Sequence, residues 1–208
     1  LGLGLLGLLA VQMLKANGCR VLGMDPDDSR VKLALELGAD VAVGAGDLDT
    51  AAETFSTGRG VDRVLICAAT QSDEPVNAAG RICRKKGTVV MVGMTGMNID
   101  RATYYKKELE FKLSMSYGPG RYDPGYEEAG VDYPYGYVRW TEQRNMQAFL
   151  ELVKEGKVTP SKFVTHEFDF DDAIKAYELL NGKTREKYLG IVLKYAAESR
   201  AGKTVSLR

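Results

Sequence analysis

The sequence opens with three glycines at a spacing typical of a phosphate-binding loop. It begins Leu-Gly-Leu-Gly-Leu-Leu-Gly, which fits G-x-G-x-x-G from its second residue. In such loops the first glycine permits a tight turn, the second lets the backbone approach a pyrophosphate, and the third lets a helix pack on a sheet. A helix predicted from about Leu5 to Lys15 would point its free N–H groups at the phosphates. The residues expected to bind a dinucleotide here are Gly2, Gly4, Leu5, Leu6 and Gly7.

A carboxylate follows at the distance that such a loop requires. Residues 19–24 predict a short buried strand, and Asp25 follows it directly, eighteen residues after Gly7. An acid at this strand end accepts hydrogen bonds from the adenosine ribose and repels a 2′-phosphate. NAD is therefore predicted in preference to NADP. Two alternatives stay open: Asp25 could serve only as a turn or cap residue, and Arg30 could either pair with a 2′-phosphate or be a solvated helix residue.

Other residues that could take part in catalysis or bind a metal lack the spacing of a reactive site. His166 is the only histidine, and Cys19, Cys67 and Cys83 have no metal-type spacing. We expect His166 to be structural. The acidic residues from Asp169 to Asp172 are more typical of a helix start than of a metal site, because acids complement the dipole there. The sequence therefore predicts neither a metal site nor a catalytic residue in this chain.

Composition excludes several classes of partner. The 208 residues carry 28 basic and 28 acidic side chains, so no net charge favours nucleic acid or an anionic membrane. No apolar run is long enough to span a bilayer. An odd number of unpaired cysteines suits a reducing compartment, so we expect a cytoplasmic protein.

Helices and strands are predicted to alternate along the chain. Continuous apolar strands between helices indicate a parallel sheet covered on both faces. The predicted fold is therefore α/β, a three-layer Rossmann fold with a doubly wound parallel sheet. The expected helices are 29–37, 48–55, 75–82, 141–155 and 171–180, and the expected strands or extended segments are 40–43, 61–67, 88–92, 109–115, 158–168 and 188–195.

Three regions are expected along the chain. Residues 1–155 form an NAD(P)-binding domain, which includes a tyrosine-rich stretch at 117–140 without clear periodicity. Residues 156–195 form a C-terminal extension, and residues 196–208 form a polar tail or linker. In the helix predicted at 141–155, the side chains expected to face inward are Met146, Phe149, Leu150 and Val153.

The chain resembles the cofactor-binding half of the medium-chain, zinc-type alcohol dehydrogenases. The resemblance covers most of the chain up to about Tyr195. Besides the glycine loop and Asp25, the stretches that carry it are Leu37–Asp40, Gly60–Val64, Gly87–Gly93 and Asp172–Tyr177. The stretch from Ser116 to Glu142 looks like bacterial two-part oxidoreductases that join such a dehydrogenase to a second Rossmann domain, some of them associated with sugar metabolism.

The resemblance implies further contacts and an activity. Loops after two later strands would border the cofactor and the nicotinamide ring, and their residues are Ala68, Ala69, Val92, Gly93 and Met94. The parent protein would transfer hydride between a secondary alcohol, such as a sugar or polyol, and nicotinamide. Its zinc would lie in a separate domain and not in this chain, so the isolated chain is expected to have little or no activity. The family also implies a homodimer paired through an edge strand.

The position of the glycine loop raises a structural expectation. Such a loop normally follows a central strand of the sheet, and here only Leu1 precedes it. We expect a truncated first strand and two unpaired inner edges, with Lys203–Leu207 or exchange with a partner as ways to fill the gap. Two alternatives to a dehydrogenase fragment are a non-catalytic nucleotide-binding or assembly domain and, less favoured, a methyltransferase-like Rossmann domain.

Overall fold

The computed structural model describes residues 1–184 and 186–196. It divides into two compact units, Leu1–Thr159 and the chain from Pro160 onward, and each is described by itself. The predicted polar tail, including Lys203–Leu207, lies outside the described residues apart from Ala196. Among the described residues, no helix has both the length and the apolarity needed to cross a lipid bilayer.

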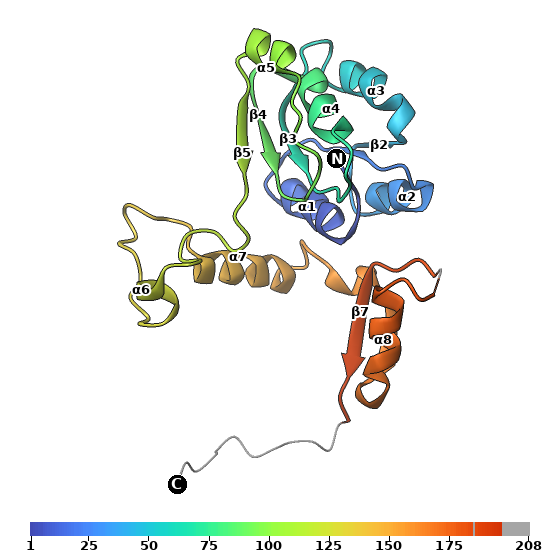
Figure 1. Ribbon diagram of the computed structural model, residues 1–208, viewed down its shortest axis with the longest axis vertical. Coiled ribbons are helices and arrows are strands. Elements are labelled where there is room, and N and C mark those ends of the chain that lie inside the picture. The colour runs from blue at the N-terminus through green and yellow to red at the C-terminus, as the bar shows by residue number, and fades with distance from the viewer. Residues whose placement is uncertain (185, 197–208) are drawn as a thin grey trace. The chain divides into compact units, whose positions relative to one another are not determined.

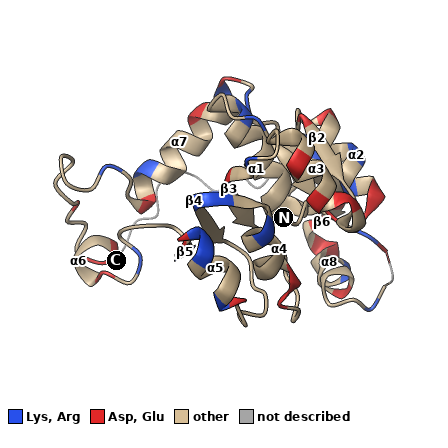
Figure 2. Cartoon of the chain, turned by 90° about the horizontal axis from the view of Figure 1, so that it is seen from above, with Lys and Arg blue, Asp and Glu red and all other residues tan. Residues whose placement is uncertain are grey.

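Helices and strands alternate through most of the first unit (Figure 1). Basic and acidic residues are interspersed along these elements (Figure 2). The elements are α1 (Leu5–Ala16), β1 (Leu22–Met24), α2 (Asp28–Glu36), β2 (Val41–Val43), α3 (Leu48–Phe55), β3 (Val61–Ile66), α4 (Glu74–Ile82), β4 (Cys83–Met91), α5 (Arg101–Lys107), β5 (Glu110–Leu113), α6 (Pro124–Glu127) and α7 (Glu142–Lys154).

All strand pairs of this unit are parallel, as the alternating pattern predicts. β1 pairs with β2, and β3, β4 and β5 form a second sheet in that order. Parallel neighbours require a crossover, which the intervening helices supply. The predicted α/β class with a doubly wound parallel sheet is confirmed.

Leu1 and Gly2 lie between the two sheets and bond to both. The N–H of Gly2 donates to the carbonyl of Met24 at the end of β1 (2.9 Å). On the other side, the amino group of Leu1 donates to the carbonyl of Leu65 (2.7 Å), and its carbonyl accepts from the N–H of Cys67 (2.7 Å). Two residues therefore connect β1 to β3, and the glycine loop starts from this connection.

The largest buried cluster anchors the second sheet. It joins α3 and α4 to the inner faces of β3 and β4, and helix α5 adds Tyr104 to it. The hydroxyl of Tyr104 donates to the carbonyl of Val76 (2.8 Å), and burial raises the pKa of this phenol to about 12. The fully or nearly fully buried members include Ile66, Val76, Ala79, Cys83 and Val89.

Two predicted element boundaries are wrong for identifiable reasons. Strand β4 begins at Cys83 and not at residue 88, because Val61 pairs with Cys83 before an irregularity shifts the register. Within that irregular stretch Lys86 takes a left-handed backbone conformation (φ 58°). The expected extended segment 158–168 is interrupted by a 3₁₀ turn at Pro160–Phe163, where proline's fixed φ suits the first turn of a helix.

The predicted inward face of α7 is also wrong. The helix forms as expected, but none of its residues is buried in the described structure. Met146 is 53% exposed and Leu150 is 63% exposed, while Phe149 and Val153 are half-buried. The 3.6-residue period located the apolar side of this helix correctly, but it could not say whether the described chain covers that side.

In its described residues, the second unit consists of a parallel pair of strands and an α-helix. β6 (Val164–Asp169) pairs with β7 (Gly190–Lys194), and α8 (Ala173–Leu180) connects them. A 3₁₀ turn at Phe170–Asp172 leads directly into α8. The acidic residues of this stretch therefore lie at a helix start, as their sequence indicates.

A lysine side chain caps the carboxyl end of α4. The ammonium group of Lys107 donates to the carbonyls of Gly80 (2.9 Å), Arg81 and Cys83 (2.8 Å). A cation suits the negative end of the helix dipole, and these carbonyls have no further helical partner. Lys106, the next residue, is exposed.

We predict that Lys107→Met lowers the free energy of unfolding by about 1–2 kcal/mol, because three carbonyls lose a charged donor while the apolar stem is retained. Lys106→Met is the matched control and should change stability by less than about 0.5 kcal/mol. Urea denaturation followed by circular dichroism measures both. Equal midpoints for the two variants would contradict the capping role of Lys107.

Candidate nucleotide-binding site

The first and third glycines of the loop are required by backbone contacts. Gly2 has φ +85°, and a Cβ there would lie 2.6 Å from the backbone nitrogen of Ala68. A Cβ on Gly7 would lie 1.9 Å from the carbonyl oxygen of Gly2. Because backbone atoms cannot move aside as flexible side chains can, only glycine fits at either position.

The second glycine is different because open space faces it. A Cβ on Gly4 would meet only the guanidinium of Arg30, at 3.8 Å. Gly4 is also the N-cap of α1, and neither a side-chain cap nor an acidic residue occupies the first turn. The start of α1 therefore presents uncapped N–H groups beside an unobstructed stretch of backbone, which is the arrangement that binds phosphate.

Asp25 holds this loop against the end of β1. Its side chain is almost fully buried, with its residue 3% exposed. One carboxylate oxygen accepts from the N–H of Leu3 (2.7 Å) and the other from the N–H of Asp27 (2.9 Å). The cap of α2 is Asp27, which accepts from the N–H of Ser29 (3.0 Å), so Asp25 does not cap that helix.

Leu3 is a contributor that the sequence did not identify. It is buried, and a Cβ on Gly23 of β1 would lie 3.1 Å from its side chain. Its position in the pattern G-x-G-x-x-G is unrestricted, so the motif itself carries no signal for it. Only the alternation of apolar residues in the opening stretch could have suggested a buried side chain here.

Arg30 lies closer to the loop than a solvated helix residue would. Its guanidinium is 3.7 Å from a carboxylate oxygen of Asp25, and its side chain is 37% exposed. It borders the same open space as Gly4. The structure therefore places Gly4, Asp25 and Arg30 together at the carboxyl end of β1.

The loops after β3 and β4 meet the glycine loop. The N–H of Met94 donates to the carbonyl of Ala68 (3.0 Å), and Ala69 forms an isolated parallel bridge with Met94. A Cβ on Gly93 would lie 2.1 Å from the carbonyl oxygen of Ala68. Ala68 is thus packed between Gly2 on one side and Gly93 on the other, which brings the three predicted loops to one edge of the sheet.

Several apolar side chains at this edge are exposed. Leu5, Leu6, Val92 and Met94 are all exposed although they flank closely packed backbone. Such exposed apolar groups, beside a backbone arranged as in phosphate-binding loops, suit the uncharged parts of a dinucleotide. Cys67 lies behind the loop, and burial raises the pKa of its thiol, which keeps the thiol uncharged at neutral pH.

The described residues of the second unit add no reactive centre. His166 lies on β6, where one ring nitrogen is 2.9 Å from the hydroxyl of Thr165 and the other is 3.0 Å from the carboxylate of Glu186. This connects β6 to the segment before β7, which is a structural role. Across the residues that the structure describes, no group of three or more His, Cys, Asp or Glu side chains is placed to hold a metal ion.

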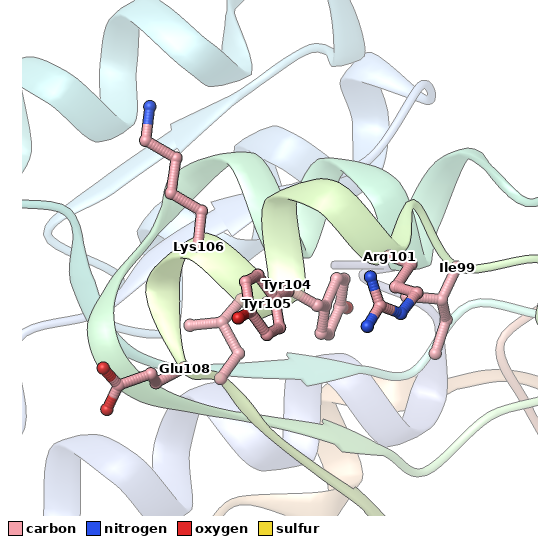
Figure 3. A pocket seen from close by; sticks show the side chains of 7 residues that line it. Ile99, Arg101, Tyr104, Tyr105, Lys106 and Glu108 are labelled. Carbon is pink, nitrogen blue, oxygen red and sulfur yellow. The ribbon is translucent and has the colours of Figure 1, made fainter.

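An open hollow of about 720 Å³ lies elsewhere on the first unit, around α5 (Figure 3). Its lining includes Ile99, Arg101, Tyr104, Tyr105 and Leu109, and none of the predicted cofactor-binding residues. Tyr105 and Arg101 face each other, with the guanidinium 5.1 Å from the ring centre. The hollow is shallow and its charged side chains diverge, so we place the candidate site at the glycine loop.

Gly7 and Gly4 make separable predictions. Gly7→Ala should lower the free energy of unfolding by about 3 kcal/mol or more, because its Cβ would overlap a backbone carbonyl. Gly4→Ala should cost no more than about 1 kcal/mol, since its Cβ enters open space. Urea denaturation of both variants measures the difference. Equal losses would show that the loop does not have this conformation.

Comparison with known proteins identifies a matching family and similar sequences. Residues 6–129, more than half of the chain, match the model of the zinc-binding dehydrogenase family. The chain is 28% identical over 198 residues to a sorbitol dehydrogenase of Halalkalibacterium halodurans, which covers 90% of the chain and 49% of that protein. It is also 28% identical over 187 residues to a D-xylulose reductase of Saccharomyces cerevisiae, covering 85% of the chain and 45% of that protein.

Solved structures agree on the fold. An alcohol dehydrogenase from Thermus sp. ATN1 superposes with a TM-score of 0.71 at 21% identity, covering 94% of this chain and 49% of that one. A dehydrogenase from Escherichia coli CFT073, solved with NADH, gives a TM-score of 0.66 at 20% identity over 92% of this chain and 50% of that one. The chain spans about half the length of these relatives. Because the family model matches more than half of the chain, this chain belongs to the zinc-binding dehydrogenases.

Proposed function

We propose that this chain is the NAD(H)-binding part of an alcohol or polyol dehydrogenase. The observation that carries the proposal is the open backbone at Gly4, at the uncapped start of α1, with the buried carboxylate of Asp25 beside it. A Cβ-free backbone, free helical N–H groups and an acid at the neighbouring strand end are the three features that a dinucleotide needs.

Different residues at this edge would contact different parts of the cofactor. The backbone from Gly4 to Gly7 would receive the pyrophosphate, and Asp25 would accept hydrogen bonds from the adenosine ribose. The loop of Val92, Gly93 and Met94 would lie against the nicotinamide half. Bound NAD would supply the hydride acceptor, and the role of this chain is to hold and orient it.

The charges near Asp25 favour NAD over NADP. Both carboxylate oxygens of Asp25 already accept backbone hydrogen bonds, so they face the cofactor as acceptors. A 2′-phosphate would approach this fixed negative charge. Arg30 offsets part of that repulsion because it lies 3.7 Å from Asp25, and this proximity is why a residual affinity for NADP is expected.

The names of the relatives suggest the substrate class. A sorbitol dehydrogenase and a D-xylulose reductase both act on hydroxyl-rich carbon chains by name, so we propose a secondary alcohol of a polyol or sugar as substrate. The described residues do not fit a zinc site, and we derive no step through that metal. The zinc that the family name implies would be held by other residues of the parent protein.

A non-catalytic nucleotide-binding or assembly domain is the competing hypothesis. Such a domain would need the same phosphate-binding loop but no surface that positions a nicotinamide ring. The exposed Val92 and Met94 beside the closely packed Gly93 favour the dehydrogenase, because they provide an apolar surface where the nicotinamide would lie.

We predict that the purified chain binds NADH with at least tenfold higher affinity than NADPH. Gly4→Ala should weaken NADH binding by at least tenfold, because a methyl group would occupy the approach of the pyrophosphate. Titration followed by NADH fluorescence measures the dissociation constants, and Gly44→Ala is the control, since a Cβ there also meets open space. Absence of NADH binding by calorimetry at millimolar concentration would refute the proposal for this chain.

We also propose a homodimer formed through β5. Among the described strands β5 pairs only with β4, which leaves its outer edge without a backbone partner. Glu110 and Lys112 are exposed and form an ion pair along this edge (2.9 Å). If two copies pair antiparallel about Phe111, Glu110 of each copy lies opposite Lys112 of the other, which stabilises the pair.

Charge exchange tests this arrangement. Glu110→Lys should weaken dimerisation by at least tenfold, because like charges would then face each other across the edge. The double variant Glu110→Lys/Lys112→Glu should restore it. Sedimentation equilibrium gives the dissociation constants, and a wild-type chain that stays monomeric at 100 µM (about the upper range for a specific dimer) would contradict the proposal.

A further inference from the structure

The loop between β4 and α5 is hydrogen-bonded to the loop that follows β3. We call residues 92–100 the β4–α5 loop. The N–H of Thr70 donates to the carbonyl of Met94 (2.9 Å), and the N–H of Gly96 donates to the carbonyl of Ser72 (3.0 Å). Backbone bonds therefore fix the first half of the β4–α5 loop against its neighbour.

The carboxylate of Asp73 packs on the β4–α5 loop and not on its own helix. Asp73 is the N-cap residue of α4, but its side chain accepts no capping hydrogen bond. One carboxylate oxygen instead accepts from the N–H of Asn98 (2.9 Å). A Cβ on Gly96 would lie 2.2 Å from that same oxygen, so the carboxylate lies directly against the loop backbone. Since an aspartate at this position ordinarily caps its helix, its bond to the loop is a separate use of the side chain.

A second side chain of α4 binds the same loop. Asn77 lies four residues after Asp73, on the same face of the helix. Its side-chain oxygen accepts from the N–H of Asp100 (2.8 Å), and its side-chain nitrogen donates to the carbonyl of Asn98 (3.2 Å). Two side chains on one face of α4 therefore anchor the second half of the β4–α5 loop.

This anchoring bears on the exposed side chains at the start of the loop. Val92 is 38% exposed and Met94 is 71% exposed, and Gly96, which Asp73 contacts, is two residues after Met94. A loop that becomes ordered only on binding loses conformational entropy, which lowers affinity. A loop fixed before binding avoids that loss. The contacts from α4 therefore favour the binding of any ligand group that Val92 and Met94 contact.

We propose that Asp73 is a positioning residue for the nicotinamide half of the cofactor. It acts through the β4–α5 loop and does not touch the cofactor itself. Among the described residues, its side chain forms no hydrogen bond with the glycine loop or Asp25, so the pyrophosphate and adenosine contacts do not depend on it. This inference rests on the proposed function, which sets Val92, Gly93 and Met94 against the nicotinamide.

NADH and ADP-ribose separate the two halves of the cofactor, because both carry the adenosine and the pyrophosphate and only NADH carries the nicotinamide. We predict that Asp73→Ala weakens NADH binding by about fivefold or more and changes ADP-ribose binding by less than about twofold, since only the nicotinamide side loses its fixed loop. Calorimetric titration measures both dissociation constants for the full chain.

Two further variants distinguish positioning from a general effect on α4. Asp73→Asn keeps an acceptor oxygen for the N–H of Asn98, so it should retain the NADH affinity to within about twofold. Glu74→Ala is the matched control. It removes a neighbouring carboxylate from the same helix start, but that carboxylate pairs with Arg81 (2.6 Å) and not with the loop. Both dissociation constants should therefore stay unchanged in Glu74→Ala.

The outcomes separate this inference from the proposed function. If the wild-type chain binds both ligands and Asp73→Ala weakens both alike or neither, the inference fails and the proposed function stands. Wild-type affinity no higher for NADH than for ADP-ribose would also overturn the inference. A chain that binds neither ligand refutes both. If circular dichroism shows Asp73→Ala to be unfolded, Asn77→Ala takes its place, because it loses two bonds to the same loop and should show the same selective loss.

Discussion

The hydrogen bonds accepted by Asp25 are the constraint on which the candidate site depends. A buried carboxylate is costly unless its oxygens are satisfied, and here the backbone N–H groups of Leu3 and Asp27 satisfy both. One bond fixes the glycine loop and the other fixes the turn into α2. The same side chain thus positions both the start of α1 and the turn into α2. A carboxamide has the same shape but exchanges one acceptor for a donor, so it could not accept both bonds.

The backbone geometry of the candidate site was largely predictable from sequence because its requirements are local. The spacing of Gly2, Gly4 and Gly7 reflects backbone conformation and close approach, which are properties of the chain itself. The sequence does not show that Gly2 and Gly93 pack on opposite sides of Ala68, because that contact joins three separate loops. Nor could it show how near Arg30 lies to Asp25, since a helix face can present an arginine to solvent or to a loop.

The errors in the fold have a common cause. Periodicity reports which residues are apolar and which side of an element they share, but it does not identify what covers that side. Met146 and Leu150 therefore shared a face as predicted yet are exposed. Similarly, the β-branched residues predicted that β4 begins at residue 88. The strand in fact begins earlier, because Cys83 pairs with Val61, and its first residues include two lysines. Tertiary pairing overrode local preference at that point.

The two backbone residues between the sheets have a consequence for cooperativity. The sheet of β3, β4 and β5 has the large buried cluster, while β1 and β2 share a ladder of only three residue pairs. Local opening free energies follow burial and contact density, so β1, β2 and α2 should open as a unit before the rest of the first unit does. The glycine loop bonds to both sides through Leu1 and Gly2. A nucleotide bound to that loop would stabilise the contact between the sheet of β1 and β2 and the sheet of β3, β4 and β5. Nucleotide binding should therefore slow amide hydrogen exchange in β1 and β2.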